Sequence, residues 1–304
     1  MSGSSPSTKP AAAAPRVPHR CLIKLQGIYP SLKRAEKRAA DHLMAAAGKI
    51  HGRSIIEFAA AAGCSEATAV RLSRKLGYDG FPELKADFEQ TDAPLPYRDV
   101  QRQDSPETVA RKIFANSIQA LWDTLDIIDV KHYRDAVEAL LKAERLAFIG
   151  LGNAAVVARE AYQKFLRIGV PTYTAEDSDL QLIIISTQLR PGDVLTAISY
   201  SGESKPIIAA AQQARARGVR VIAITNYPRS TLAKLADCVL LTAVFQEHVY
   251  GEIASKRLAQ LCVLESLYVN YLLRRSGQLG DRLLASNQAV AINKRPARKP
   301  TRSS

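Results

Sequence analysis

The most constraining feature of this chain is an alternation that begins at about Glu144. Short apolar, β-branched runs alternate from there with segments of helical periodicity. Runs that are apolar on both faces and separated by helices are typical of a parallel sheet covered on both sides. The pattern therefore predicts an α/β domain with a five-stranded parallel sheet. The strand candidates are Leu146–Ile149, Val170–Tyr173, Val194–Ser199, Val219–Thr225 and Cys238–Thr242.

The amino-terminal part of the chain carries an all-helical pattern instead. Ser31 is positioned to cap a helix in which apolar residues recur every three or four positions. Two shorter helices are predicted at Ile55–Ala62 and Glu66–Leu76, separated by a tight turn at Gly63-Cys64. Two short helices joined by a glycine turn have the dimensions of a DNA-binding helix-turn-helix.

The second short helix has two unlike faces. At about 100° per residue, Ala69 and Leu72 fall on one face, and Arg71 and Arg74 fall on the other, with Thr68 and Lys75 at its margin. An arginine can hold a phosphate or pair with a guanine in bidentate fashion. The outward face of this helix is therefore a candidate DNA-reading surface.

Breaks in composition divide the chain. Two prolines interrupt the helical periodicity at Thr91–Asp99, which predicts an interdomain linker, and Ser105-Pro106-Glu107 opens a helix that runs to about Ile128. We expect five segments in the following order. They are a disordered tail at 1–20, a helix-turn-helix domain at 21–97, a linker helix at 98–128, the α/β domain at 129–280 and a basic disordered tail at 281–304.

The net charge of +13 is concentrated towards the two ends of the chain. Residues 1–90 hold 14 basic and 8 acidic residues, and residues 281–304 hold 6 and 1, whereas the middle is nearly neutral. Basic segments favour a polyanionic partner, because neutralising phosphates releases counterions. A surface that merely improves solubility would show the same bias.

Four separated cysteines, Cys21, Cys64, Cys238 and Cys262, form no CxxC pair, so neither a zinc site nor a disulfide framework is predicted. No segment approaches the roughly 18 apolar residues that a membrane span requires. We expect a cytoplasmic protein without a membrane partner, a metal or a cofactor.

The first candidate ligand loop is the strand-turn-helix stretch FIGLGNAAVVA (Phe148–Ala158). Its Gly-x-Gly turn leaves backbone amides at a helix start free to face an anion. Dinucleotide binding is disfavoured, because the third glycine of that fingerprint is replaced by Ala155. The ligand contacts expected here are Gly150, Gly152 and Asn153.

The second candidate loop is AISYSGESKPIIAA (Ala197–Ala210), which lies between a buried strand and a helix. Hydroxyl groups, free amides and the positive end of a helix can together surround a phosphate dianion, although serines also cap helices and turns. With a strand order of 2-1-3-4-5, both loops would meet at the switch point where ligands bind. The contacts expected in this loop are Ser199, Ser201, Gly202, Glu203, Ser204 and Lys205.

The helix-turn-helix segment resembles the RpiR family of bacterial transcriptional regulators. CSEATAVRLSRKLGYDGFPELK (Cys64–Lys85) is similar to that family's recognition helix and the turn after it, and SLKRAEKRAADHLMAA is similar to its opening helix. The resemblance implies a double-stranded DNA operator as partner. It implies DNA contacts from Ser65, Glu66, Thr68, Arg71 and Arg74, to which Lys75 is added from the margin of the outward face.

The second ligand loop, with its SYSGES stretch, resembles the sugar-isomerase (SIS) domain, a flavodoxin-like fold that binds phosphosugars. That domain is the usual carboxyl-terminal partner of the RpiR helix-turn-helix, so the resemblance implies a phosphorylated sugar or sugar acid as effector. The chain departs from the family where a serine is common and Ala154 stands instead. It also departs within Glu247–Leu261, where Glu252 and Ser255 are the expected ligand contacts.

SIS domains also occur in aldose-ketose isomerases, which need a general base, and Glu247, His248 and Glu252 could supply one. An attached DNA-binding domain makes sensing the simpler role. A basic RNA-binding or scaffolding protein would explain the charge but not the serine-rich loop. We therefore predict a non-enzymatic, carbohydrate-responsive transcriptional regulator, a homodimer or homotetramer on a pseudo-palindromic operator, with a phosphosugar isomerase as the alternative.

Overall fold

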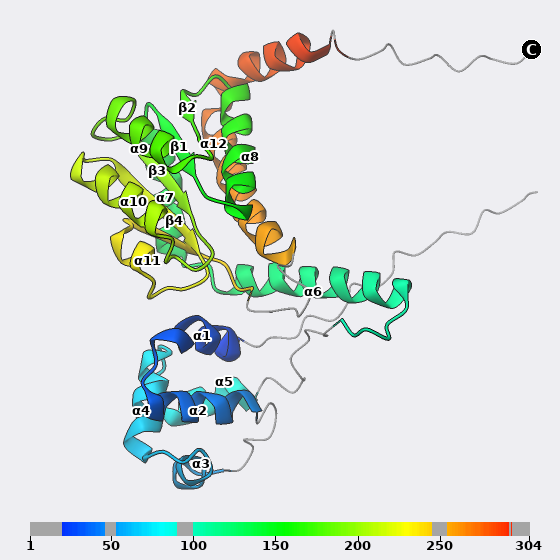
Figure 1. The fold of residues 1–304 in the computed structure, drawn as a ribbon, viewed down its shortest axis with the longest axis vertical. Coiled ribbons are helices and arrows are strands. Elements are labelled where there is room, and N and C mark those ends of the chain that lie inside the picture. Colours follow the sequence, from blue (N-terminus) through cyan, green and yellow to red (C-terminus); the bar gives the residue numbers. More distant parts are fainter. Residues whose placement is uncertain (1–19, 46–52, 90–99, 245–253, 292, 294–304) are drawn as a thin grey trace, which may run out of the picture.

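The computed structural model describes residues 20–45, 53–89, 100–244, 254–291 and 293. A helical domain at one end and a sheet domain at the other are joined through a long helix, α6 (Pro106–Asp126) (Figure 1). The predicted linker at Thr91–Asp99 and the predicted ligand contact Glu252 lie outside the described residues, as do Glu247, His248 and residues 1–19 and 294–304.

The helical domain confirms the all-helical prediction but contains two helices that were not predicted. Its elements are α1 (Arg20–Ile28), α2 (Arg34–Ala45), α3 (Ile55–Ala61), α4 (Glu66–Lys75) and α5 (Phe81–Glu89). The FPELK stretch, predicted as a turn, is the start of α5. Pro82 is tolerated in the first helical turn, where its missing amide has no helical partner to lose. Phe81, Leu84 and Phe88 are buried and hold α5 in the core.

The prediction that Ser31 caps α2 is wrong. Ser31 ends a short 3-10 turn (Tyr29–Ser31), and its hydroxyl donates to the Ile28 carbonyl over 2.7 Å. The Lys33 amide is satisfied instead by the Glu36 carboxylate, 2.9 Å away. The chain therefore enters α2 two residues later than the serine suggested.

The sheet confirms the predicted fold class. Its five strands are all parallel, in the order β2-β1-β3-β4-β5, with Ile149 of β1 opposite Ala197 of β3. Each strand begins and ends within two residues of its predicted limits. Their bounds are β1 (Leu146–Ile149), β2 (Thr172–Tyr173), β3 (Val194–Ile198), β4 (Arg220–Thr225) and β5 (Cys238–Leu241).

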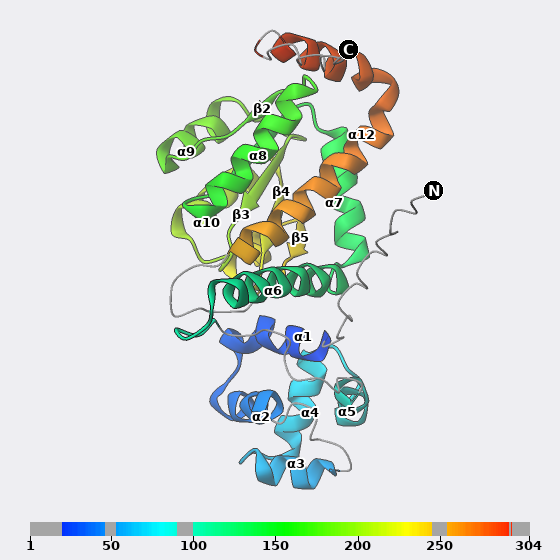
Figure 2. The same ribbon diagram turned by 90° about the vertical axis from the view of Figure 1, so that its right-hand side faces the viewer.

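Helices cover both faces of this sheet (Figures 1 and 2). One face packs against α7 (Val130–Lys142), α8 (Asn153–Arg167) and α12 (Ala254–Ala291). The other packs against α9 (Ser178–Thr187), α10 (Lys205–Ala216) and α11 (Thr231–Leu235). None of the helices in the described ranges is both long and apolar enough to cross a bilayer.

The predicted disordered tail begins too early, because α12 continues through residues 281–291 after a kink at Arg275. Leu279 is buried in the core of the sheet domain. Arg282 donates to the Gly169 carbonyl over 3.0 Å, and Arg167 donates to Asn287 over 2.7 Å. These long-range contacts hold a segment that has no strong periodicity of its own.

Candidate DNA-binding and ligand-binding sites

The helix-turn-helix is built from α3, a tight turn and α4. Ser54 and Glu57 form a capping box at the start of α3, and the Ser65 hydroxyl accepts from the Thr68 amide at the start of α4. Each cap satisfies amides that a helix start leaves without partners. Arg38 of α2 donates to the Gly63 carbonyl over 2.9 Å and so fixes the turn between the two helices.

The two faces of α4 are those the periodicity predicted. Ala69 and Leu72 are buried against the domain core, whereas Glu66, Arg71 and Arg74 are exposed. The exposed arginines lie about one turn apart on the outer face of α4, where a DNA groove or backbone could approach them.

Two predicted DNA contacts, Thr68 and Lys75, are engaged within the protein instead. Thr68 is buried, so its predicted place at the margin of the outward face is wrong. Its hydroxyl lies 2.9 Å from that of Ser65 and accepts from the Arg71 guanidinium over 3.1 Å. Lys75 forms an ion pair of 2.7 Å with the buried Glu36 of α2. Thr68 thereby orients Arg71, and Lys75 fastens α4 to α2.

The ion pair with Lys75 changes the titration of Glu36. Burial opposes the charged form, but hydrogen bonds from Lys75 and from the Lys33 amide outweigh it and hold the pKa of Glu36 below its ordinary value. The carboxylate is therefore charged at neutral pH.

In the sheet domain, the first ligand loop follows β1. Gly152 and Asn153 are exposed at the start of α8. Gly150 is packed so closely under α8 that a Cβ atom there would lie 2.6 Å from the carbonyl carbon and oxygen of Ala154. A glycine is therefore required at Gly150 for the helix to begin directly above the strand.

The second loop follows β3 and is bonded to itself. Ser199 is buried and accepts from the Gly202 amide over 3.1 Å, and the exposed Ser201 accepts from the Glu203 amide over 3.2 Å. Gly202 has a φ of +66°, and a Cβ atom there would lie 2.2 Å from the Ser230 hydroxyl oxygen. The loop thus depends on a glycine both for its conformation and for its packing.

The end of this loop combines a helix start with a structural tie. Lys205 is exposed at the first position of α10, and Ser204 precedes it without a side-chain cap bond. The Glu203 carboxylate accepts from both the amide and the hydroxyl of Thr231, at 2.8 Å each. Glu203 is therefore occupied in holding the start of α11.

The sheet order brings the two loops together, as the switch-point argument requires. β1 and β3 are neighbours, and both loops leave the carboxyl ends of these strands. Ser201, the helix starts of α8 and α10, and Lys205 at the first position of α10 accordingly lie at one edge of the sheet. Such a set of hydroxyl donors, amides and positive charge can bind a phosphate.

Two residues at this edge were not predicted. Gln181 of α9 is buried and donates to the carbonyls of Gly150 (3.1 Å) and Ala175 (2.8 Å), so it supports the first loop. Lys256 of α12 lies with its ammonium nitrogen 3.9 Å from the centre of the Tyr200 ring, so it adds a cation beside the second loop. Neither residue stands in a motif that sequence reasoning could have singled out.

Ser255, an expected ligand contact, is buried near the start of α12. Its hydroxyl lies 3.2 Å from that of Ser117, on α6. Its side chain contributes to the packing of α12 on α6, and its contact with the ligand stays a prediction.

The ligand edge is physically connected to the DNA-binding helix. Arg229 lies four residues after the end of β4, and its guanidinium donates to the Lys75 carbonyl at the end of α4 over 3.4 Å. Nearby, a cavity of about 360 Å³ is lined from the helical domain by Gly27, Pro30 and Ser31 and from the sheet domain by Ser201, Glu203, Tyr227, Arg229 and Ser230. The second ligand loop therefore borders the space between the domains.

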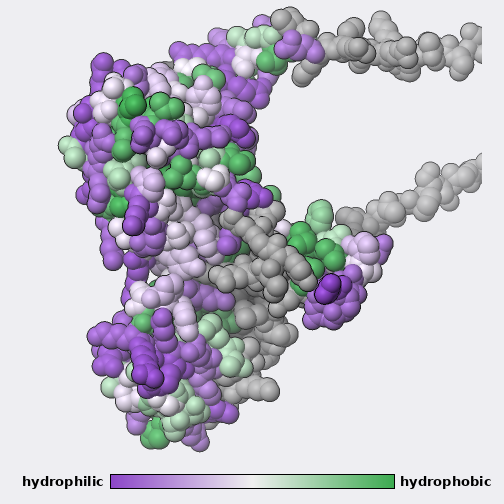
Figure 3. Space-filling view, viewed as in Figure 1, coloured by the Kyte–Doolittle hydropathy of each residue, from purple (hydrophilic) through white to green (hydrophobic). Residues whose placement is uncertain are grey.

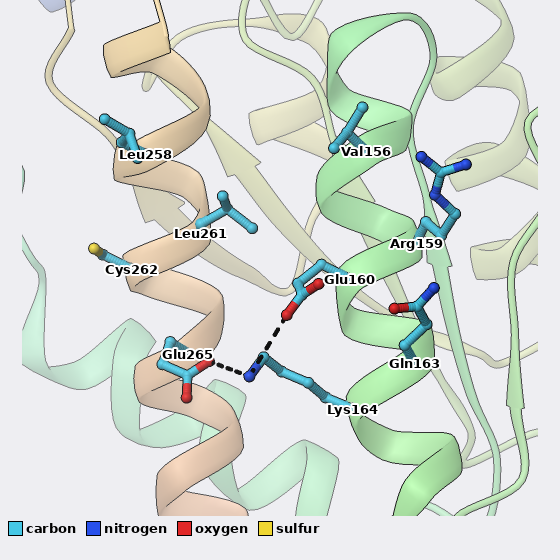
Figure 4. A pocket seen from close by; sticks show the side chains of 9 residues that line it. All are labelled: Val156, Arg159, Glu160, Gln163, Lys164, Leu258, Leu261, Cys262 and Glu265. Atoms are coloured by element: carbon cyan, nitrogen blue, oxygen red, sulfur yellow. Dashed lines mark ion pairs between the residues drawn. The ribbon is translucent and has the colours of Figure 1, made fainter. Parts of the chain in front are cut away.

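A further groove, of about 580 Å³, runs between α8 and α12 (Figure 4). Val156, Leu258 and Leu261 give it an apolar part. Lys164 crosses it and pairs with Glu160 (3.6 Å) and Glu265 (2.7 Å). Within the described residues, no group of histidine, cysteine or acidic side chains has an arrangement that could hold a metal ion.

Comparison with known proteins supports the assignment of both domains. The sequence model of the helix-turn-helix domain of the rpiR family matches residues 19–94, and that of the SIS domain matches residues 139–270. The chain is similar to the transcriptional regulator HexR of Escherichia coli, at 31% identity over 88% of this chain and 93% of that protein. It is also similar to the uncharacterized regulator YbbH of Bacillus subtilis, at 34% identity over 82% of this chain and 89% of that protein.

Among solved structures, the chain is similar to the NanR protein of Vibrio vulnificus in complex with ManNAc-6P. The TM-score is 0.58 and the identity 25%, over 91% of this chain and 100% of that one. The curated relatives are transcriptional regulators that match along nearly their whole length, which favours the regulator over the isomerase alternative. This chain is a helix-turn-helix transcriptional regulator of the RpiR family, with a SIS domain that follows its DNA-binding domain in the sequence.

Proposed function

We propose that a phosphorylated sugar or sugar acid controls the affinity of this regulator for its DNA operator. The observation that carries the proposal is the loop Ser199–Ser204, which places serine hydroxyls and the start of α10 beside the Gly-x-Gly turn at Gly150. NanR, a relative in sequence and fold, binds ManNAc-6P, a phosphorylated sugar. Glu252 is a further proposed contact of the same ligand.

The DNA side of the proposal rests on α4. Arg71 and Arg74 are exposed on its outer face, and Arg71 is oriented by Thr68. Ser65 and Glu66 lie at its amino end, where recognition helices commonly meet base edges. We propose that the regulator acts in the cytoplasm as a homodimer or homotetramer, which presents paired recognition helices to a pseudo-palindromic operator.

Communication between the sites follows from the bonds of the second loop. Gly202 donates and accepts within a cluster that includes Ser199 and Leu232, and Glu203 holds Thr231. The segment 226–231 is thereby tied to the loop, and its Arg229 reaches the end of α4. An effector that binds this loop differently in two domain arrangements shifts the balance between them, and with it the DNA affinity.

A thermal-shift screen of phosphorylated sugars and sugar acids tests the ligand class. A compound that binds only the folded protein raises the melting temperature by mass action, by an amount that grows with its concentration. The unphosphorylated sugar serves as the matched control, since the proposed site recognises the phosphate. A screen in which no phosphorylated compound raises the melting temperature contradicts the proposal.

The site is then located with the variant S201A/K205A. Both side chains are exposed, so we expect the fold to persist. The apparent affinity, taken from the ligand concentration at which the thermal shift develops, should fall at least about tenfold. The variant T187A, an exposed hydroxyl at the end of α9, is the control and should respond as the parent does. An unchanged response in S201A/K205A would place the ligand elsewhere.

A further inference from the structure

The two exposed arginines of α4 are held in different ways. The Arg71 guanidinium donates to the Thr68 hydroxyl over 3.1 Å. Within the part of the chain that the structure describes, Arg74 makes no hydrogen bond or ion pair. Hydrophilic residues cover the side of the helical domain along which α4 runs (Figures 1 and 3). Both arginines therefore belong to a polar surface, but only Arg71 has a direction fixed by the protein.

The acceptor that holds Arg71 is itself immobile. Thr68 is 2% exposed, and its branched Cβ atom restricts its side-chain rotamers. Its hydroxyl lies 2.9 Å from that of Ser65, which also accepts from the Thr68 amide over 3.2 Å. A hydroxyl has one proton and two lone pairs, so Thr68 can bond to Ser65 and still accept from Arg71. The oxygen that meets Arg71 is thus fixed by burial and by the cap of α4.

A second restraint on Arg71 comes from α2. Burial and the bonds from Lys75 and the Lys33 amide act most strongly on the pKa of Glu36, and the charge of Arg71 also lowers it. Arg71 consequently lies within electrostatic reach of this buried carboxylate, which attracts it. The carboxylate of Glu36 and the hydroxyl of Thr68 restrict the Arg71 side chain together.

We propose that Arg71, positioned by Thr68, reads a guanine in the major groove, and that Arg74 binds a backbone phosphate. Bidentate pairing with the O6 and N7 atoms of guanine requires one orientation of the guanidinium plane, which a side chain held in advance supplies. A phosphate can be approached from many directions, so it suits an arginine without a fixed direction. The division of roles rests on the proposed DNA contact of α4 and adds which residue reads the sequence.

The position of each arginine along α4 agrees with its role. Arg71 is the sixth residue of the helix and Arg74 the ninth, and the residues towards the amino end of such a helix reach the base edges. The bond to Thr68 uses one of the five N–H donors of Arg71, so two remain for a guanine. Fixing a long side chain costs rotamer entropy, and for Arg71 part of this cost is met on folding rather than on binding.

Two DNA duplexes test this division with the full chain. The first is selected by the parent protein from a randomised library, and the second is a scrambled duplex of the same length and base composition. Fluorescence anisotropy over a range of salt concentrations gives the ratio of the two affinities and the salt dependence of each. The ratio reports on base reading, whereas the salt dependence reports on phosphate contacts.

The matched variants R71K and R74K keep the charge and lose the fork-shaped guanidinium. We expect R71K to lower the ratio by about 5- to 150-fold at an unchanged salt dependence. R74K should change both affinities by the same factor, and R74A should weaken both and lower the slope of log affinity against log salt by about one. R217K, at an exposed arginine of the sheet domain, is the control. Equal losses of the ratio in R71K and R74K, or a parental ratio in R71K, overturn the proposal.

Thr68 is tested by a pair of variants that differ in the hydroxyl. We expect T68V, which keeps the shape of the side chain, to lower the ratio by about 2- to 10-fold, and T68S to restore it. A purely structural role would instead lower the melting temperature and weaken binding to both duplexes together. A parental ratio in T68V, or the same loss in T68S, overturns the positioning role. Parental affinity of R71A/R74A for the selected duplex would instead refute the DNA contact of α4, so the two failures are distinguishable.

Discussion

The recognition helix α4 and the serine loop Ser199–Ser204 are both short, polar segments beside a glycine turn, yet they hold their functional groups in different ways. On α4 the arginines project from a face that contributes nothing to the core, while Ala69 and Leu72 do the packing. In the serine loop, Ser199 and Gly202 are buried and the exposed Glu203 is bonded to Thr231, while Ser201 and Lys205 are exposed beside them.

The difference follows from the size of the ligand that each segment is suited to meet. A DNA duplex can be read from a convex surface, so its contacts can be separate from the core. A phosphate is small and must be surrounded, so the groups that surround it are also the ones that shape the loop. Substitutions of the exposed arginines of α4 should therefore separate function from stability, and substitutions of the loop residues bonded into the domain, Ser199, Gly202 and Glu203, should not.

The largest expected effect is the loss of DNA binding in R71A/R74A. If each arginine contributes about 1–3 kcal/mol, operator affinity falls at least about 30-fold, while the melting temperature stays unchanged because both side chains are exposed. Fluorescence anisotropy at constant salt measures the affinity, and R217A, an exposed arginine of the sheet domain, is the control. Retention of parental affinity would show that α4 is not the reading helix.

The serine loop should give the opposite result in G202A. A Cβ atom at this position meets the Ser230 hydroxyl at 2.2 Å, and the backbone has a φ of +66°. We expect a loss of about 2–4 kcal/mol in the free energy of unfolding together with loss of the ligand-induced shift. Urea denaturation measures the first quantity. G192A is a control for backbone strain alone, since Gly192 has a φ of +92° but open space around its Cβ position. Parental stability in G202A would contradict the tight packing of the loop.

The ion pair between Lys75 of α4 and Glu36 of α2 stabilises the fold, so it makes the free energy of unfolding depend on pH. Glu36, whose pKa is lowered, stabilises the domain when it is charged, so its contribution is present above its ordinary pKa of 4.5 and is lost as the pH falls through the lower, folded value. We expect E36Q to lose about 1.5–3 kcal/mol of unfolding free energy at pH 7. The gap between E36Q and the parent should narrow in urea denaturation below pH 4.5. A gap that is constant with pH would show that the charge of Glu36 is not its source.

The smallest effect is expected where the two regions meet. R229A removes the hydrogen bond to the Lys75 carbonyl, and we expect both DNA and ligand to bind while the coupling between them weakens by about 0.5–2 kcal/mol. Operator titrations with and without effector measure the coupling as a ratio of two affinities. R215A, on the far side of the same domain, should keep the parental ratio. An unchanged ratio in R229A would mean that another contact carries the signal.

Local patterns were enough to predict much of the fold. Alternating apolar runs predicted the five parallel strands, and two short helices joined by the turn at Gly63-Cys64 located the helix-turn-helix. These features act over a few residues, so neighbours along the chain determine them. Where a serine bonded backwards to a preceding carbonyl, as Ser31 does to Ile28, the cap prediction failed.

The amino-acid sequence by itself determined the fold class, the two loops and the outward arginines of α4, because periodicity and turn chemistry are local properties. Only the tertiary structure decided what those residues do to one another. It paired Lys75 with Glu36, set Gln181 beneath Gly150, brought Lys256 to Tyr200 and left the apolar face of α6 exposed. Contacts between residues distant in the chain depend on how whole elements pack, and no spacing within a single segment records them.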